Sequence, residues 1–156
     1  MSQGKLVFQN KINIRNKKAS FEYQILDKYI AGIVLQGSEI KSIRLGKVNL
    51  QDSYCTFFND ELYVKEMHIA PYELAKNYNH EAKRDRKLLL NKKELKKLFV
   101  KNKEKGLTII PLRIFLNDKG LAKLEIAMAK GKKIYDKRED IKDRDLKRDM
   151  ARLKIR

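Results

Sequence analysis

Two segments of this chain read as β-hairpins, and they constrain the fold more than any other feature. Residues 54–70, YCTFFNDELYVKEMHIA, place aromatic and β-branched residues on both sides of Asn59-Asp60, a pair typical of hairpin turns. Residues 106–129 repeat the pattern around the turn NDKG. Pro111 lies inside the first strand of that second hairpin and cannot donate to a ladder, so it marks a sheet edge or a bulge. The chain is therefore predicted to be built from short antiparallel strands.

A third β-rich segment precedes these hairpins. Residues 21–35, FEYQILDKYIAGIVL, are predicted to form two strands with a tight connection near Asp27-Lys28. Phe21, Tyr23 and Ile25 alternate with polar neighbours, which indicates that one face is buried.

The segment GSEIKSIRLGK carries the signals of a short helix. Ser38 is a suitable N-cap, and Gly46 is suited to the left-handed position that ends a helix. Lys41 and Arg44 lie three residues apart and give this helix a basic side.

The strongest helix signal is LLLNKKELKKLFVKNKEKG. Asn91 is the predicted N-cap with Glu94 completing a pattern like a capping box, and Leu90 with Leu95 forms the hydrophobic staple. Gly106 is predicted to stop the helix, whose outer face is mostly lysine.

Together these elements predict a mainly β protein with helices (α+β). About six strands and two or three helices in about 130 residues favour an OB-fold-like small antiparallel barrel, although spacing alone does not separate it from other small barrels. A basic C-terminal tail follows, so we expect a body over 1–130 and a tail over 131–156.

The charge balance indicates a polyanionic partner. The chain has 37 Lys and Arg against 20 Asp and Glu, a formal net charge of +17, and nucleic acid is the commonest partner of such a protein. A membrane surface is the rival, but no apolar run approaches the ~20 residues that span a bilayer. The first residues lack the apolar region of a signal peptide, so we expect a cytoplasmic protein.

Catalytic and metal-binding patterns are not found. His68, His80 and Cys55 do not form a credible zinc set, and neither a P-loop nor a dinucleotide-binding glycine motif occurs. We therefore expect no catalytic residues, no metal and no cofactor. A nuclease with Asp and Glu metal ligands stays an alternative, because such sites leave little trace in one sequence.

One stretch concentrates the positive charge. Residues 83–105 hold eleven Lys or Arg against three acids. This is more than the solvated face of an amphipathic helix requires, and it favours phosphate contacts. Tyr72, Tyr78 and Asn79 precede the stretch and offer rings and an amide for RNA, although Tyr72 after Pro71 is equally suited to anchoring a loop.

Several motifs, in order, resemble the SmpB (SsrA-binding protein) family of bacteria. They include GSEIKSIRLGK, NHEAKRDRKLLLNKKEL, KEKGLTIIPLRIF and AKGKKIYDKREDIKDRD, and the resemblance runs from about residue 13 to the C-terminus. It implies an OB-fold barrel without catalysis that binds the tRNA-like domain of transfer-messenger RNA. It also implies delivery of this RNA to stalled ribosomes for trans-translation, in which the incomplete protein is tagged for proteolysis.

The resemblance carries over a set of RNA-facing positions and a set of tail positions. The RNA-facing candidates are Asn16, Lys17, Lys18, Glu39, Lys41, Ser42, Arg44, Gly46, Lys47, Asn49, Lys87 and Leu89. The ribosome-engaging candidates are Gly131, Lys132, Lys133, Tyr135, Asp136, Lys137 and Arg138. One departure is visible: Ile30 stands where family members often carry an acid linked to RNA binding.

The tail has the composition of a segment that folds on a partner. It holds eleven basic and six acidic residues, with Asp140 and Arg144 at helical spacing and Leu146, Met150 and Leu153 along a narrow apolar stripe. We expect it to be disordered when free and helical on the ribosome, at the decoding centre and in the vacant mRNA channel. A monomer is expected. The alternative function is that of a ribosomal protein with a basic extension.

Overall fold

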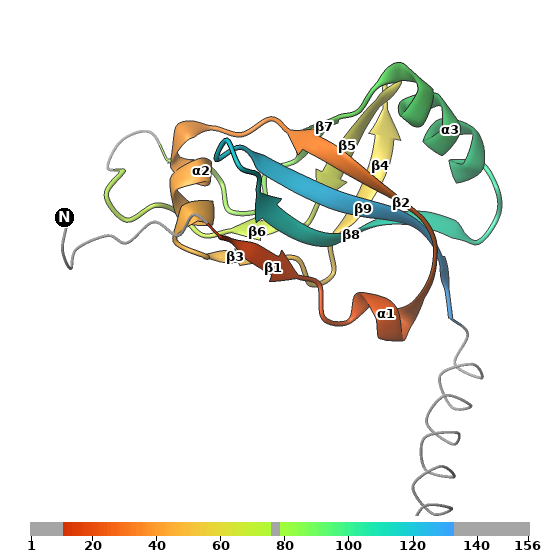
Figure 1. Ribbon diagram of the computed structural model, residues 1–156, viewed down its shortest axis with the longest axis horizontal. Helices are drawn as coiled ribbons and strands as arrows, with labels where there is room; N and C mark the ends of the chain where they lie inside the picture. The colour runs from red at the N-terminus through yellow and green to blue at the C-terminus, as the bar shows by residue number, and fades with distance from the viewer. Residues whose placement is uncertain (1–10, 76–78, 133–156) are drawn as a thin grey trace, which may run out of the picture.

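The computed structural model describes residues 11–75 and 79–132, which form nine strands and three helices (Figure 1). The strands are β1 (Asn13–Arg15), β2 (Tyr23–Ile33), β3 (Val48–Asn49), β4 (Tyr54–Phe58), β5 (Glu61–Lys65), β6 (His68–Ile69), β7 (Arg86–Leu89), β8 (Leu107–Leu116) and β9 (Ala122–Gly131). The helices are α1 (Ala19–Glu22), α2 (Gly37–Arg44) and α3 (Lys92–Asn102).

The main sheet closes on itself. Its order is β1-β8-β4-β5-β7-β2-β9, and β9 also pairs with β8, so the strands from β8 to β9 form a ring. Each of these pairings is antiparallel. The expected mainly β fold, a small antiparallel barrel with helices, is confirmed.

Both hairpins form around the predicted turns. Asn59 and Asp60 have φ values of 50° and 63°, the left-handed conformation that a tight two-residue hairpin turn requires. The register of β8 against β9 shifts between Pro111 and Arg113, so of the two alternatives predicted at this proline, an edge or a bulge, the bulge is present. The first hairpin is shorter than predicted: it ends at Lys65, and β6 pairs with β3 instead.

The prediction of two strands over 21–35 is wrong. β2 is one continuous strand, and the register shift between Ile25 and Asp27 is a bulge rather than a turn. Asp27 and Lys28 pair with β9 on the far side of the bulge, and the Asp27 carboxylate accepts a hydrogen bond from Lys101 of α3. A bulge absorbs a turn-like residue without reversing the chain, because the partner strand runs on alongside.

The N-cap of helix α2 lies two residues before the predicted cap, Ser38. Gln36 is the N-cap, and it forms a capping box with Glu39, whose Oε1 accepts from the Gln36 N–H at 2.8 Å. Ser38 lies inside the helix instead. Gly46 has a φ of 75°, as predicted for the residue that ends this helix.

Helix α3 has the predicted N-cap but ends earlier than predicted. Asn91 Oδ1 accepts from the Glu94 N–H at 2.8 Å. The helix ends at Asn102, before Gly106. The residues just before Asn91 form β7, a strand that was not predicted, because RKLLL has no turn residue separating it from the helix.

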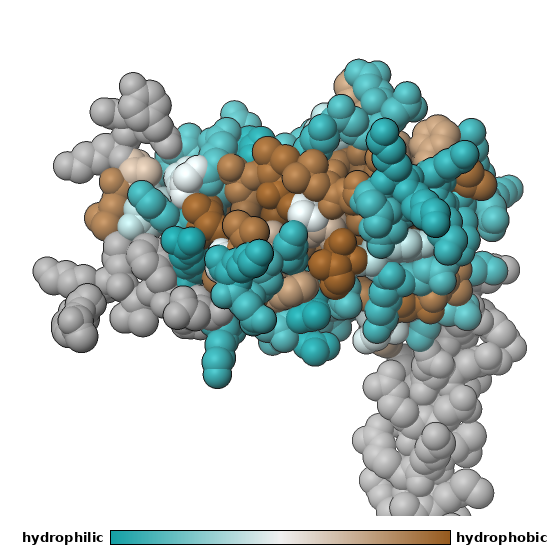
Figure 2. All heavy atoms as spheres, turned by 45° about the horizontal axis from the view of Figure 1, so that its top comes forward, coloured by the Kyte–Doolittle hydropathy of each residue, from teal (hydrophilic) through white to brown (hydrophobic). Residues whose placement is uncertain are grey.

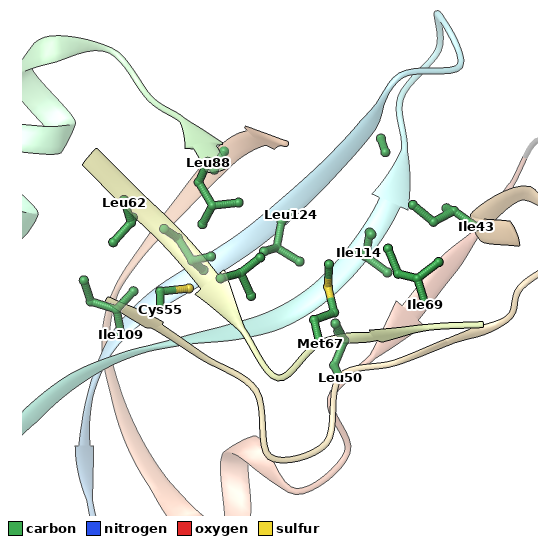
Figure 3. Packing of buried hydrophobic residues seen from close by; sticks show 14 of the residues in the cluster. Ile43, Leu50, Cys55, Leu62, Met67, Ile69, Leu88, Ile109, Ile114 and Leu124 are labelled. Atoms are coloured by element: carbon green, nitrogen blue, oxygen red, sulfur yellow. The ribbon is translucent and has the colours of Figure 1, made fainter. Parts of the chain in front are cut away.

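The core fills the barrel and extends under both larger helices. Figure 3 shows Leu124, Ile114 and Cys55 inside the ring of strands, with Ile43 of α2 at one end. Leu98 of α3 belongs to the same cluster and is fully buried. Helices α2 and α3 thus lie at opposite ends of the barrel (Figure 1). Within the described segments, none of the helices has the length and apolar character to cross a bilayer.

Candidate nucleic-acid interface

The loop between β1 and α1 lies beside a shallow cavity with a basic rim. Asn16, Lys17 and Lys18 line a hollow of about 410 Å³ together with Asn49 of β3. The backbone N–H of Asn16 donates to the Leu112 carbonyl at 2.8 Å, and its side-chain amide donates to the Pro111 carbonyl at 3.0 Å. The bulge at Pro111 therefore holds Asn16 in place, while both lysines are exposed.

A second basic group lies on α2 and the residues that follow it. Lys41 and Lys47 are exposed, and Arg44 is partly exposed. Lys47 Nζ lies 3.5 Å from Glu73, a pair in solvent that contributes little to stability. Because β3 follows Gly46 and Lys47 directly, this group runs into Asn49 on the cavity rim.

Glu39 and Ser42 lie on the other side of α2 and face inward. Both side chains are fully buried. Glu39 accepts hydrogen bonds from Arg84 Nη2 at 2.6 Å and from Arg86 Nε, and Arg86 also donates to the carbonyl of Met67 at 2.7 Å. The Glu39 carboxylate is not exposed to a ligand in this structure, and its hydrogen bonds form a clamp that holds α2 against Arg84 and the first residue of β7.

The hydrogen bonds within this clamp decide the ionisation of Glu39. Burial raises the pKa of a carboxyl group, but the hydrogen bonds from Arg84, from the Gln36 N–H and from Arg86 outweigh it. The net pKa of Glu39 is below its ordinary value. Burial lowers the pKa of Arg86 against the opposing effect of Glu39.

The loop after Pro71 is anchored rather than presented to a ligand. The Tyr72 side chain is buried, and Lys41 Nζ lies 5.4 Å from the centre of its ring. Asn79 Oδ1 accepts from the Tyr72 N–H at 3.1 Å, and its amide donates to the Tyr72 carbonyl at 2.9 Å. His80 is also buried, bonded to Ser38 Oγ at 2.8 Å. Of the two roles open for Tyr72, the loop anchor fits; Tyr78 lies outside the described residues.

An apolar patch lies on β2 and β7. Ile30 and Val34 are each 45% exposed, and Leu89 is 50% exposed beside Gly32, its partner across the strands. Figure 2 shows hydrophobic side chains gathered in the middle of the face that carries these strands, flanked by hydrophilic ones. Lys87 lies on the same strand as Leu89 and pairs with Glu61 at 2.8 Å, which raises the pKa of Lys87.

The exposed groups of this arrangement suit the binding of a charged partner. No three His, Cys, Asp or Glu side chains of the described segments are grouped so that they could hold a metal ion. The exposed functional groups are ammonium and guanidinium groups, an amide-lined hollow and an apolar patch. These groups suit phosphates, bases and riboses of RNA.

Comparison with known proteins identifies the family of this chain. The family model described as SmpB protein matches residues 13–156. The chain belongs to the SmpB family. It is 59% identical to the SsrA-binding protein of Cytophaga hutchinsonii over 144 residues, covering 92% of this chain and 94% of the relative. It is 53% identical to that of Desulforudis audaxviator over 138 residues, covering 88% of this chain and 90% of the relative.

A solved SmpB structure has the same fold. It is described as "tmRNA-SmpB: a journey to the center of the bacterial ribosome", and it matches with a TM-score of 0.69 and 43% identity. The match covers 83% of this chain and 94% of the other.

The positions carried over from SmpB resolve into three groups in this fold. Asn16, Lys17, Lys18 and Asn49 share one cavity; Lys41, Arg44, Gly46 and Lys47 form the outer side and end of α2; Lys87 and Leu89 lie on β7. Gly131 ends β9, and the Lys132 N–H donates to the Glu22 carbonyl at 2.9 Å. Lys133, Tyr135, Asp136, Lys137 and Arg138 lie outside the described residues.

Sequence reasoning missed the clamp arginines. Arg84 and Arg86 were counted among the phosphate-binding charges of 83–105, yet Arg86 is fully buried. The available signal was the alternation of Arg86 with Leu88, which places both on the inner face of a strand.

Proposed function

We propose that this protein binds the tRNA-like domain of transfer-messenger RNA and accompanies it to stalled ribosomes for trans-translation. Its part is to bind and position RNA, and it catalyses no reaction. Because its partners work where messages are translated, its place is the cytoplasm.

Family membership is the observation that carries this proposal. The two SsrA-binding proteins compared above match 92% and 88% of this chain, and the description of the similar solved structure names tmRNA-SmpB and the bacterial ribosome. The geometry supports the same role, since a basic, amide-lined hollow beside α2 suits a folded RNA whose phosphates converge.

The three groups divide the work of binding. Lys17, Lys18 and Arg44 supply charge for phosphates, and Asn49 lines the same hollow as the two lysines. Leu89 and Ile30 offer apolar contact to the face of a ribose or base. Ile30 stands where family members often carry an acid, so in this proposal the RNA contact at this position is apolar and involves no carboxylate.

The segment 131–156 is proposed to act on the ribosome rather than on transfer-messenger RNA. In this proposal it enters the vacant mRNA channel past the decoding centre and becomes helical against ribosomal RNA. Its net charge of +5, from eleven basic and six acidic residues, supports that partner.

The test is a binding measurement with the full chain. We expect transfer-messenger RNA to bind at least tenfold more tightly than small-subunit ribosomal RNA of equal length. Arg44→Ala should weaken binding and make its salt dependence shallower by about one contact, while Lys130→Ala, which removes a charge from β9, should change neither. Equal affinity for both RNAs would favour the ribosomal-protein alternative.

Catalysis is tested separately. Transfer-messenger RNA incubated with the protein and Mg²⁺ should keep its full length on a denaturing gel. Shortening of the RNA that scales with protein concentration and stops with EDTA would instead support a nuclease.

A further inference from the structure

A further hollow lies beside β1, the strand at the end of the sheet order (Figure 1). We call it the β1–β8 hollow; it has a volume of about 770 Å³ and is lined by residues 11–13, Arg113 and residues 115–120. None of these residues belongs to the three groups described above. Ile12 lies against the residue that ends α2, since a Cβ atom at Gly46 would be 3.9 Å from Ile12 Cδ1. The hollow is therefore at the α2 end of the barrel.

The β1–β8 hollow adjoins the surface that holds the RNA-facing positions. A space of about 390 Å³ shares Arg113 with the β1–β8 hollow, and it shares Arg15, Asn16 and Lys17 with the cavity that Asn49 lines. Because neighbouring spaces share these side chains, the three hollows follow one another over one surface. An RNA bound at Asn16 and Lys17 thus reaches the β1–β8 hollow without leaving the protein.

The lining of the β1–β8 hollow is basic. Lys11, Arg113 and Lys119 line it against a single acid, Asp118. Lys11 and Lys119 are exposed, and within the described segments no ion pair joins either of them to an acid. Exposed ammonium groups beside a hollow suit the phosphates of a nucleic acid.

Arg113 is held in a fixed orientation on the wall of the hollow. Its Nε donates to Glu125 Oε1 at 3.2 Å, and its Nη1 donates to Asn13 Oδ1 at 3.4 Å. The guanidinium carbon lies 4.2 Å from the centre of the Phe115 ring. Arg15 lies directly opposite Arg113 in the pairing of β1 with β8, and like charges in that position destabilise a sheet. An anionic partner would relieve this repulsion.

The Phe115 ring faces outward and has no part in the core. Its neighbour Ile114 belongs to the core cluster, so the alternation of the strand turns Phe115 to the outer face of the sheet, where it is partly exposed. Phe115 is a member of neither hydrophobic cluster, whereas Phe57 packs against the main cluster. Aromatic rings and guanidinium planes are the surfaces on which proteins stack unpaired bases of RNA.

We propose that the β1–β8 hollow binds one unpaired nucleotide of the tRNA-like domain. Its base stacks on the Phe115–Arg113 pair, and Lys11 and Lys119 contact the adjoining phosphates. The inference deepens the proposed function and rests on it. A base inside a helix is already stacked on its neighbours, so this site selects an RNA with a looped-out nucleotide over an uninterrupted double helix.

The first test places a fluorophore at the site. The chain has no tryptophan, so Phe115→Trp introduces a single one in the hollow. A base stacked on the indole quenches its emission, and we expect the tRNA-like domain at saturation to remove at least half of it. The matched control is Phe58→Trp in the β4–β5 turn, where Phe58 is 64% exposed and outside the hollow; its emission should change by less than a tenth.

Two further RNAs complete the fluorescence test. A double helix without unpaired nucleotides and a fragment of small-subunit ribosomal RNA, both of equal length, should each quench Phe115→Trp by less than a fifth. Equal quenching of Phe115→Trp and Phe58→Trp by the tRNA-like domain would overturn the proposal. Equal quenching of Phe115→Trp by the tRNA-like domain and by either of the other RNAs would overturn it as well.

The second test measures affinity for the tRNA-like domain. Phe115→Leu keeps an apolar side chain but removes the ring, and affinity should fall about fivefold or more, the effect expected for the stacking of one base. Phe115→Tyr keeps the ring and should stay within threefold of the unchanged protein, as should the control Phe58→Leu. Urea unfolding shows whether each variant is folded, and the fluorescence of Phe115→Trp decides alone if Phe115→Leu is not.

The outcomes separate this inference from the proposed function. Equal affinity of folded Phe115→Leu and Phe115→Tyr would mean that the ring only covers the sheet, and it would overturn the proposed stacking site. In that case the unchanged protein would still prefer transfer-messenger RNA over ribosomal RNA. Loss of that preference in the unchanged protein would instead refute the proposed function.

Discussion

Replacing Glu39 by glutamine should destabilise the protein strongly without removing an RNA contact. Glu39 and Arg86 are both fully buried, and glutamine keeps the size of the side chain while removing its charge. Removing one partner of a buried ion pair leaves an uncompensated charge and typically costs about 3–5 kcal/mol. We expect the free energy of unfolding to fall by about that amount, which corresponds to a loss of roughly 10–20 °C in Tm for a domain of this size.

The assay is urea unfolding followed by circular dichroism, with linear extrapolation to water. The matched control is Glu61→Gln, which removes the same charge from a pair with Lys87 that is 42% exposed on the glutamate side. Solvent screens that pair, so the control should unfold at nearly the same urea concentration as the unchanged protein. A Glu39→Gln variant as stable as the control would refute the reasoning that Glu39 compensates the buried charge of Arg86.

RNA binding by the Glu39→Gln variant distinguishes a structural role of Glu39 from a direct contact with RNA. At a temperature where Glu39→Gln remains folded, its affinity for transfer-messenger RNA should stay within about threefold of the unchanged protein, because the carboxylate does not reach the surface. A hundredfold loss by a fully folded variant would mean that Glu39 acts on the RNA more directly than its burial allows.

Three further outcomes follow from the same structure. The pKa of Glu39 is lowered on folding, so the unfolded chain binds the proton more readily than the folded chain does. The stability that ionised Glu39 contributes is therefore present above the ordinary pKa of 4.5 and is lost as the pH falls through the lowered value. Glu39→Gln should flatten the dependence of the unfolding free energy on pH in that acid range. Asn91→Ala removes the side-chain acceptor for the Glu94 N–H and should cost about 1 kcal/mol in urea unfolding. Asn117→Ala removes the acceptor for the Leu121 N–H in the β8–β9 turn and shows by comparison what the loss of an asparagine outside a helix costs. Changing Tyr135 and Asp136 together to Ala should leave transfer-messenger RNA affinity unchanged and abolish tagging in a reconstituted translation reaction; lost RNA affinity would show that body and tail do not divide the work.

The features that were predictable from sequence are those decided within a few residues. Asn59-Asp60 makes a hairpin turn because both residues tolerate the left-handed conformation, and Asn91 caps α3 because its acceptor lies three residues away. The bulge at Pro111 follows from a missing backbone donor.

The features that were missed depend on partners far along the chain. Asp27 reads as a turn residue, and only pairing with β9 and Lys101 makes it part of a strand. In sequence Arg86 has the features of a surface cation, but in the structure it is buried because it pairs with Glu39, 47 residues away. The RNA-facing positions predicted on α2 were likewise not separated into exposed Lys41 and buried Ser42, because the parts of the chain that cover α2 are far away in sequence.

The junction at the end of β9 links two parts of the molecule mechanically. The loop with Asn16, Lys17 and Lys18 leads straight into α1, and the carbonyl of Glu22, the last residue of α1, accepts from the N–H of Lys132. A four-residue helix thus connects the loop at the RNA-binding hollow to the point where the tail leaves the sheet. Because this hydrogen bond joins α1 to Lys132, any displacement of α1 on RNA binding would also move the first residue after β9.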